Sequence, residues 1–195
     1  MWTPRPFRSY TAERMATTVS SRQELLLQER RCAPHCQQAG VSMKVVDFLR
    51  SDCVIPCLRG KNKTEVLYEL AEHLARIRPG IDVQVLSQAL VEREHLASTA
   101  IGEGIAIPHG RVDSAGTLMC VFGRSVEGLD FDSFDGKPTH LIFMLVGPSG
   151  AAGIHLKALA RLSHLLRDAA FRQRLLMAST SESLFETIRE EDAKH

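Results

Sequence analysis

Two histidines, His109 and His155, stand in sequence surroundings that suit chemistry on an anion. His109 follows the short apolar run 105–107 and then Pro108, which has no amide hydrogen to donate to a strand ladder. We therefore predict that His109 lies at the carboxyl end of a strand, where the ligand sites of open α/β sheets collect. A neutral imidazole is a nucleophile near pH 7, and a phosphoryl group placed on it needs cationic and amide donors nearby.

Four side chains near His109 in the sequence are candidates to bind such a phosphoryl group. The guanidinium groups of Arg93 and Arg111 offer cationic donors, and the hydroxyls of Ser98 and Thr99 offer neutral ones. Each also has a plainer interpretation. Arg93 can be the charged end of a helix face and Arg111 a solvated loop residue, while the two hydroxyl residues can serve in caps or turns.

His155 begins a helical pattern of its own. The leucines that follow it at helical spacing are Leu159, Leu162 and Leu166. This spacing places His155 on the core-facing stripe and in the first turn of the helix. Free amides at a helix N-terminus favour anions, so we expect His155 to donate to a phosphate held against the sheet edge. The alternative is an interfacial histidine whose hydrogen bonds are satisfied within the fold.

Three glycines surround His109 in the sequence: Gly102, Gly104 and Gly110. None of them carries a side chain that could block access to the imidazole ring. We expect them to let backbone amides, or the surface of another protein, come close to that ring.

Alternating helix and strand signals surround these residues. Asn62 can cap one helix, which Pro79 and Gly80 would stop, and Asp82 can cap the next. Strand-like apolar runs occupy residues 53–58, 105–107, 118–122 and 141–146, and further helical patterns follow at 153–167, 168–178 and 181–190. The unbroken run 141–146 is typical of a strand covered on both sides. We predict an α/β fold with a mixed α+β sheet: a three-layer sandwich with helices on both faces of a central mixed β-sheet.

Charge and composition change near residue 42. Residues 1–42 carry six arginines and three glutamates, a local charge of +3, and predict a flexible or disordered N-terminal extension. Residues 43–195 carry 18 basic and 20 acidic residues and form the predicted domain. The extension can also be interpreted as a leader, as an organelle transit peptide, or as an artefact of start-codon choice.

The overall composition excludes several function classes. The chain has 24 basic and 23 acidic residues, a net charge of +1, which disfavours binding of nucleic acid through its phosphates. No window approaches the ~20 consecutive apolar residues that a membrane-spanning helix needs. We therefore expect a cytoplasmic protein with no nucleic-acid partner and no membrane insertion.

The cysteines indicate free thiols rather than a metal centre. Cys32 and Cys36 flank His35, and Cys53 and Cys57 repeat that spacing, yet the apolar neighbours of the second pair favour core packing. A total of five cysteines also argues against a disulfide framework. We therefore expect no metal and no other cofactor.

Residues 98–110, with the sequence STAIGEGIAIPHG, resemble the phosphorylation-site signature of the fructose/mannitol-type IIA domain of the bacterial phosphoenolpyruvate-dependent phosphotransferase system. Arg93 stands where that family keeps an arginine at the phosphohistidine. The segment that begins with His155 is similar to the family's second-histidine segment, and residues 129–145 resemble its acidic turn and following strand. The resemblance extends over residues 43–190 and implies the fold of that family.

The resemblance implies that Nε2 of His109 accepts a phosphoryl group from a histidine phosphocarrier similar to HPr, with Arg93 and His155 beside it. A stand-alone chain is most similar to the nitrogen-regulatory branch, which acts on partners such as potassium-transport components and sensor kinases. One alternative is a sugar-specific IIA component that passes phosphate to a IIB domain, and another is a protein-interaction module that is not phosphorylated. A histidine-dependent hydrolase is disfavoured because the sequence has no Gly-x-Ser-x-Gly elbow and no His-Glu-x-x-His pair.

Two further expectations follow from this resemblance, and the oligomeric state stays open. A transient docking surface predicts exposed apolar side chains around His109. The family often has glycine at the position of Ala97, so the backbone there has less conformational freedom in this chain.

Overall fold

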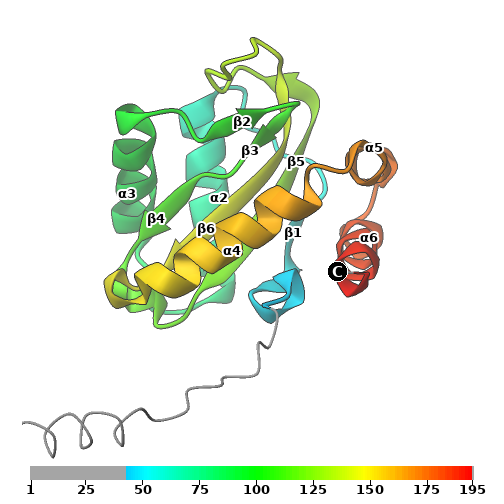
Figure 1. Cartoon of the computed structure of the whole chain (residues 1–195). Helices are drawn as coiled ribbons and strands as arrows, with labels where there is room; N and C mark the ends of the chain where they lie inside the picture. Colours follow the sequence, from blue (N-terminus) through cyan, green and yellow to red (C-terminus); the bar gives the residue numbers. More distant parts are fainter. Residues whose placement is uncertain (1–42, 195) are drawn as a thin grey trace, which may run out of the picture. The chain divides into compact units, whose positions relative to one another are not determined.

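The computed structural model of the protein describes residues 43–194, and a six-stranded mixed sheet organises them (Figure 1). The strands are β1 (Leu49–Ile55), β2 (Ala100–Gly102), β3 (Ile105–Ala106), β4 (His109–Arg111), β5 (Met119–Leu129) and β6 (Thr139–Gly147). They lie in the order β1-β5-β6-β3-β2, and β4 also pairs with β6. Because β6 is antiparallel to β5 but parallel to β3 and β4, the predicted mixed sheet is confirmed.

Helices cover both faces of this sheet. They are α2 (Lys63–Ile77), α3 (Val83–Leu96), α4 (Ala152–Leu165), α5 (Ala169–Met177) and α6 (Ser181–Ala193), with short 3-10 turns η2 (Val45–Asp47), η3 (Asp113–Ala115) and η4 (Ser149–Ala151). Helices α2 and α3 lie on one face and α4 crosses the other, while α5 and α6 lie beside the β1 edge (Figure 1). The predicted three-layer α/β architecture is therefore confirmed.

The two predicted helix starts are confirmed by their caps. The Asn62 side chain accepts a hydrogen bond from the Glu65 amide, and the Asp82 carboxylate accepts from the amides of Gln84 and Val85. These amides have no partner within the helix, so each cap stabilises its helix by about 1 kcal/mol. The caps fix where α2 and α3 begin and, through the regular rise of the helix, where their side chains point.

Strand β6 is the core of the sheet. Residues 141–146 are all buried, as their unbroken apolar run predicts, and the Phe143 ring stacks on Phe122 of β5 with 4.4 Å between centroids. Burying a side chain of this size contributes about 1.5–3 kcal/mol relative to leaving it in water. The carboxyl half of β6 is thus packed in the core, and β4, which begins with His109, pairs with this half of the strand.

Several strand boundaries differ from the prediction. The strand expected over residues 53–58 is β1, which ends at Ile55 just before Pro56, and the strand expected over 118–122 extends to Leu129. Strand β2 was missed entirely because its sequence, Ala-Ile-Gly, is too short to show alternation. Helical patterns proved easier to delimit than strands because they repeat over several turns.

The interpretation of Pro108 as a strand end is wrong in one respect. Strand β3 does end at Ala106, but β4 begins at His109 and continues along β6. Pro108 has no amide hydrogen, yet its carbonyl accepts a 2.8 Å hydrogen bond from the amide of Leu145, so the pairing passes the proline. His109 therefore begins a strand instead of following one, and its partner in the ladder is Leu145.

Residues 1–42 lie outside the described residues. The predictions made for them, including the flexible extension and the cysteine pair around His35, stay predictions. Within residues 43–194 the three cysteines are free thiols, and no group of three or more His, Cys, Asp or Glu side chains could hold a metal ion. None of the helices in that range is both long and apolar enough to cross a membrane.

Candidate functional site

His109 is half-buried and has a hydrogen-bond partner at each ring nitrogen. Arg93 Nε donates to His109 Nε2 over 3.1 Å, and Nδ1 lies 3.0 Å from the carbonyl oxygen of Ile107. Because Nε2 accepts, the neutral ring carries its proton on Nδ1 and donates it to Ile107. Burial lowers the pKa of His109, and the nearby charges of Arg93 and Arg111 lower it further. The ring is therefore neutral near pH 7, with its lone pair on Nε2.

Close packing of α3 on β4 brings Arg93 to this ring. A Cβ atom added at Gly110 would lie 3.3 Å from Leu90 Cδ2, a tight contact that glycine avoids where the helix approaches the strand. Arg93 follows Leu90 by three residues and lies on the same face of α3. The expectation that Gly110 opens a path for a ligand or partner is wrong, because α3 fills that space.

Gly102 and Gly104 were also expected to open access to the His109 ring, and the structure gives them a different role. They form the tight turn between β2 and β3, with φ of +83° and +78°, and Glu103 between them also has a positive φ of 54°. Such angles favour glycine, so these residues shape the turn that precedes Pro108 instead of exposing the ring. A Cβ at Gly102 would also lie 2.9 Å from the Phe134 ring.

Ala97 causes no strain, although glycine was expected at its position. Its φ of −170° is extended backbone that any residue adopts. Its carbonyl accepts a 3.0 Å hydrogen bond from Arg93 Nη1. Arg93 therefore ties the end of α3 to His109 with two of its donors.

His155 lies in the first turn of α4, as predicted, and only 4% of its surface is exposed. Its ring centroid lies 5.8 Å from that of His109, with an angle of 60° between the planes. Neither ring nitrogen has a hydrogen-bond partner within residues 43–194. Burial lowers the pKa of His155, and the neighbouring His109 and Arg111 add to the effect. Leaving such a group without a partner costs about 1–3 kcal/mol, so this ring is poised to donate to a group bound beside His109.

Arg111 is exposed at the end of β4, opposite Gly147 of β6. A Cβ at Gly147 would lie 3.5 Å from His155 Nδ1, so the backbone at this point passes close to the second histidine. The charge of Arg111 lowers the pKa of both His109 and His155. Arg111 therefore acts on both rings through its charge, and its exposed side chain agrees with the interpretation as a solvated residue.

The two hydroxyl candidates lie in the loop after α3 and are engaged within the protein. Ser98 Oγ donates to the Phe131 carbonyl over 2.7 Å, and Thr99 Oγ1 donates to Glu94 Oε2 over 2.5 Å. Each hydroxyl has a single proton to donate. Direct donation from either side chain to a phosphate would therefore first break one of these bonds.

The sequence analysis missed Glu94 and its partner Lys63. The carboxylate of Glu94 is buried and receives hydrogen bonds from Thr99, while Lys63 Nζ lies 3.1 Å from Oε1. A signal was present, because Glu94 follows the buried Leu86 and Leu90 at a spacing of four residues. A carboxylate on the apolar stripe of a helix needs a buried partner and should have been singled out.

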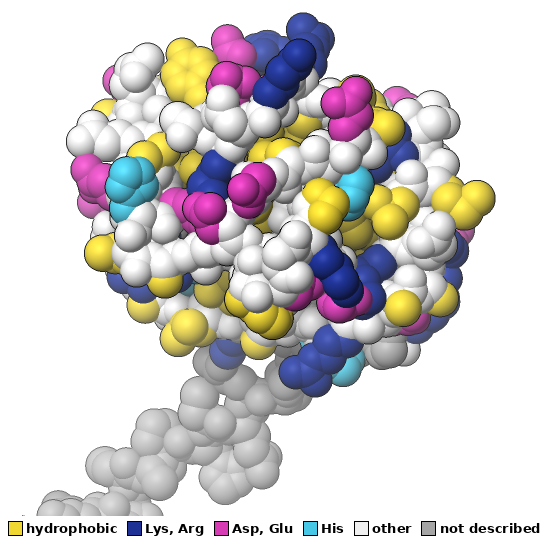
Figure 2. All heavy atoms as spheres, turned by 90° about the horizontal axis from the view of Figure 1, so that it is seen from above, with side chains coloured by type: hydrophobic (Ala, Val, Ile, Leu, Met, Phe, Trp, Pro, Cys, Tyr) yellow, Lys and Arg dark blue, Asp and Glu magenta, His cyan; other side chains and the backbone are white. Residues whose placement is uncertain are grey.

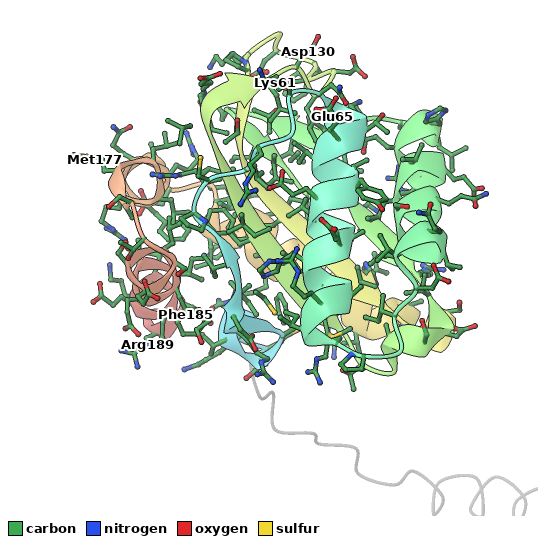
Figure 3. All side chains as sticks on the ribbon, turned by 180° about the vertical axis from the view of Figure 1, so that it is seen from behind. Lys61, Glu65, Asp130, Met177, Phe185 and Arg189 are labelled. Carbon is green, nitrogen blue, oxygen red and sulfur yellow. The ribbon has the colours of Figure 1, made fainter. Side chains whose placement is uncertain are left out.

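Lys63 and Glu94 line a polar pocket of about 710 Å³ beside the loop after α3. Ala97, Ser98 and the acidic residues Asp130 and Asp132 also line it. Figure 3 shows Asp130 at the same end of the molecule as Lys61 and Glu65, near the start of α2. Figure 2 looks onto this end, where acidic side chains gather beside a basic one.

The acidic turn after β5 holds the β2–β3 turn in place. The Asp135 carboxylate accepts hydrogen bonds from Ser133 Oγ and from the Glu103 amide, and these lower the pKa of Asp135 to about 2. Lys137 Nζ in turn donates to Glu103 over 2.8 Å. The strained turn that leads to Pro108 and His109 is thus fastened from one side.

Exposed apolar side chains lie on the two helices that bring Arg93 and His155 to the site. Leu96 at the end of α3 is 83% exposed, and Ile154 and Leu156 on either side of His155 are also exposed. Large apolar side chains of this kind are common where one protein docks on another. Together with a neutral imidazole, two arginines and an unpaired histidine, the arrangement suits a nucleophile that receives an anion from a docked protein.

A family model described as "Phosphoenolpyruvate-dependent sugar phosphotransferase system, EIIA 2" matches residues 47–191. The nitrogen regulatory protein of Bradyrhizobium diazoefficiens is 34% identical over 146 residues, which cover 75% of this chain and 95% of that protein. The fructose-specific EIIABC component of Bacillus subtilis is 37% identical over 150 residues, which cover 77% of this chain but only 24% of that longer protein.

Solved structures agree with these sequence matches. The crystal structure of the nitrogen regulatory protein IIA-Ntr from Neisseria meningitidis superposes with a TM-score of 0.68 at 30% identity, covering 73% of this chain and 97% of that one. The IIA mannitol structure from Escherichia coli superposes with a TM-score of 0.61 at 22% identity and shows the same fold, covering 71% of this chain and 97% of that one.

Proposed function

The chain belongs to the EIIA 2 family of the phosphoenolpyruvate-dependent sugar phosphotransferase system, and on this basis we propose that His109 accepts a phosphoryl group from an HPr-like phosphocarrier protein. Proteins of this family are phosphotransfer components, and this chain is similar both to nitrogen regulatory proteins and to fructose and mannitol EIIA domains. The family that residues 98–110 predicted is thus confirmed, and the phosphoryl group on His109 is the proposal.

One observation carries this proposal: the lone pair of a neutral His109 is on Nε2, where it accepts a 3.1 Å hydrogen bond from Arg93 Nε, and the centroid of the His155 ring lies 5.8 Å from that of His109. A phosphoryl group on Nε2 would lie between a guanidinium and a buried imidazole that lacks a hydrogen-bond partner in the described residues. Preorganised donors of this kind stabilise the charge of a transferring phosphoryl group.

In the transfer step, the Nε2 lone pair of His109 attacks the phosphorus of a phosphohistidine on the carrier. The new Nε2–P bond forms as the P–N bond of the donor breaks, and the electron pair of that bond returns to the donor imidazole. Little covalent chemistry is required of the protein, so positioning and charge stabilisation dominate. The Nδ1 hydrogen stays on the ring, and its bond to Ile107 stabilises the positive charge that the ring acquires.

The neighbours of His109 then change partners. Arg93 Nε donates to the Nε2 lone pair in the unphosphorylated state, and that lone pair becomes the P–N bond, so the guanidinium turns its donors to the phosphoryl oxygens. His155 donates its N–H to the same oxygens. The field of Arg111 stabilises the anion at longer range, and Ser98 and Thr99 hold the loop without direct contact.

The signal of the phosphorylated protein is its added charge. A phosphoryl group brings about −1.5 to −2 charge to a surface that also exposes Leu96, Ile154 and Leu156. A partner that docks on these apolar side chains therefore meets a different electrostatic field in each state. We propose that regulation occurs through such contacts, as in the nitrogen-regulatory branch, with potassium-transport components and sensor kinases as candidate partners.

The match to a fructose-specific component supports a second function, transfer of the phosphoryl group onward to a IIB domain. Incubating the phosphorylated protein with isolated fructose-type and mannitol-type IIB domains separates the two. Rapid loss of phosphate to a IIB domain would favour the sugar branch, and retention of phosphate would favour the regulatory one.

Intact-mass spectrometry tests the proposal after incubation with phosphoenolpyruvate, enzyme I and the carrier protein. One acid-labile phosphoryl group should appear on the full chain, and His109→Ala should lack it. His95→Ala is the matched control, because His95 is an exposed histidine on α3. An unphosphorylated, well-folded wild-type protein would instead support an interaction module that does not carry phosphate.

A further inference from the structure

Glu94 is a buried carboxylate to which the proposed transfer step gives no role. Its side chain is only 2% exposed, although it is one residue from Arg93 on α3. Taking a carboxylate out of water is costly unless it is paired and hydrogen-bonded. An uncharged side chain would be less costly to bury at this position. The contacts of Glu94 therefore indicate which groups its charge binds.

Glu94 receives four close contacts from two residues. The Thr99 amide lies 3.0 and 3.1 Å from its two oxygens, and the Thr99 hydroxyl donates to Oε2 over 2.5 Å. Lys63 Nζ lies 3.1 Å from Oε1 and neutralises the charge. Hydrogen bonds to an ionised group are about twice as strong as neutral ones, so Thr99 is fixed both at its backbone and at its side chain.

Thr99 is connected to His109 through one further residue. The Thr99 carbonyl accepts a 3.0 Å hydrogen bond from the Ile107 amide, and the Ile107 carbonyl is the group that His109 Nδ1 contacts at 3.0 Å. The position of that carbonyl sets both the orientation of the ring and the nitrogen that keeps the proton. A continuous path of hydrogen bonds thus runs from the Glu94 carboxylate to the Nδ1 side of His109.

The Nε2 side of the same ring depends on the residue next to Glu94. Arg93 donates to Nε2 and to the carbonyl of Ala97, two residues before Thr99. Adjacent residues of α3 therefore fasten the loop over residues 97–99 from both ends, and each controls one nitrogen of His109. If the loop shifted, both contacts of the ring would change together.

We infer that Glu94 is a positioning residue that holds His109 in the tautomer and orientation required for attack by Nε2, acting through Thr99 and Ile107. This inference rests on the proposed role of His109 as phosphoryl acceptor. A ring that loses its bond to Ile107 can place its proton on Nε2, and that nitrogen then has no lone pair with which to attack phosphorus.

The charge of Glu94 also acts directly on the site. It raises the pKa of His109, in opposition to the stronger effects of burial and of Arg93. Lys63 stays charged beside it, because burial lowers the pKa of Lys63 but hydrogen bonds to Asp132 and Glu94 raise it by more. Neutralising Glu94 should therefore lower the pKa of His109 further while loosening its hydrogen bond to Ile107.

Glu94→Gln in the full chain tests this inference with little change in side-chain size. The 15N chemical shifts of the His109 ring report its tautomer, and phosphorylation by the carrier system reports its reactivity. We expect wild-type His109 to show an Nδ1–H tautomer, and Glu94→Gln to show a mixture of tautomers and a lower His109 pKa. Phosphorylation should slow about 10- to 100-fold, since misplacing a reacting group by about 1 Å costs up to 10²-fold.

Glu92→Gln is the matched control, because Glu92 is an exposed glutamate on the same helix whose contact is the Gln88 side chain. It should leave the tautomer and the rate unchanged. Thr99→Val is a second probe, which removes only the hydroxyl contact and should give a smaller change of the same kind. Thr99→Ser should restore the wild-type values.

A folded Glu94→Gln protein with wild-type ring shifts and a wild-type rate would overturn the inference. If Glu94→Gln does not fold, an unchanged tautomer and rate in Thr99→Val would overturn it equally. Failure of the proposed function looks different: wild-type His109 would take up no phosphate, while the ring shifts would still show whether Glu94 sets the tautomer.

Discussion

Two regions of the molecule bury charged or polar side chains, and they differ in how completely those side chains are paired. Near the carboxyl end of α6, Asp192 is fully buried and accepts hydrogen bonds from Arg161 Nε and Nη2 at 2.9 and 2.7 Å, as well as one from the Val46 amide. Near the end of β4, His155 is also buried, but neither of its ring nitrogens has a hydrogen-bond partner in the described residues.

This difference in hydrogen bonding distinguishes a buried group that stabilises the fold from one that is available to a ligand. The Arg161–Asp192 pair joins α4 to α6, and its carboxylate is paired within the protein, so its contribution is to hold the fold. His155 has no hydrogen-bond partner in the described residues, at a cost to stability, and it lies beside a histidine whose Nε2 lone pair can act as a nucleophile. Among the described residues the buried hydroxyl of Thr139 also lacks a hydrogen-bond partner, so the position of His155 beside His109, together with its missing partner, is what indicates a site. Four predictions test this comparison.

The largest expected effect is on stability and comes from the paired region. Asp192→Ala leaves the buried guanidinium of Arg161 without its carboxylate and should reduce the free energy of unfolding by about 3–5 kcal/mol. Urea denaturation measures this loss. The fraction that remains folded should still be phosphorylated at the wild-type rate.

Glu186→Ala is the control for this prediction, because Glu186 forms an exposed ion pair with Arg189 on the same helix. Figure 3 labels Arg189 on the outside of α6. This change should cost less than about 1 kcal/mol. Equal losses from the two substitutions would contradict the distinction between paired burial and surface pairing.

Arg93→Ala should show the reverse pattern. Removing a donor to a developing anion costs about 10²- to 10³-fold in rate, so phosphorylation of His109 should slow by this factor. The free energy of unfolding should change by less than about 1.5 kcal/mol, the value of a typical hydrogen bond. Quenched-flow phosphorylation measures the rate, and urea denaturation measures the free energy of unfolding. Arg76→Ala, at an exposed arginine, is the control. A large loss of stability in Arg93→Ala with an unchanged rate would refute the assignment of Arg93 to the site.

His155→Leu should change stability and function in opposite directions. Replacing an unpaired buried imidazole by an apolar side chain should stabilise the fold by about 1–3 kcal/mol. Phosphorylation should slow about 10²-fold, because a donor to the phosphoryl group is lost. Thermal unfolding and phosphorylation kinetics check both changes. A destabilised His155→Leu protein would mean that the ring is satisfied within the fold.

The smallest effect is the pH dependence of stability. His109 and His155 both have a lowered pKa in the fold, chiefly because of burial. Below about pH 6.5 the unfolded chain therefore binds more protons than the folded protein does. Stability should therefore decrease from pH 7 to pH 5, and His155→Leu should reduce that slope. Phosphorylation should also slow in the same range, because a protonated His109 has no lone pair. A His155→Leu protein with the wild-type slope would contradict the depressed pKa of His155.

The sequence analysis identified the residues proposed to bind the phosphoryl group, but it missed or misread the residues that position them. His109, Arg93 and His155 each occupy a local pattern, and the structure brings all three together. Glu94 had a local signal in its spacing after Leu86 and Leu90, but its contact with Lys63 joins residues 31 positions apart in the chain, on two helices whose packing no local pattern describes. Gly110 was misread for the same reason, since only the position of α3 explains it.

Local sequence patterns were enough to predict the order of the helices and the longer strands, the caps of α2 and α3, and the buried run of β6. These are decided over a few residues, by hydrogen bonds and periodicity that need no distant partner. The packing of distant segments sets which nitrogen of His109 carries the proton, how near His155 lies, and which buried groups are paired. Those properties depend on the register of β4 with β6 and on the packing of α3 and α4, which join residues far apart in the chain.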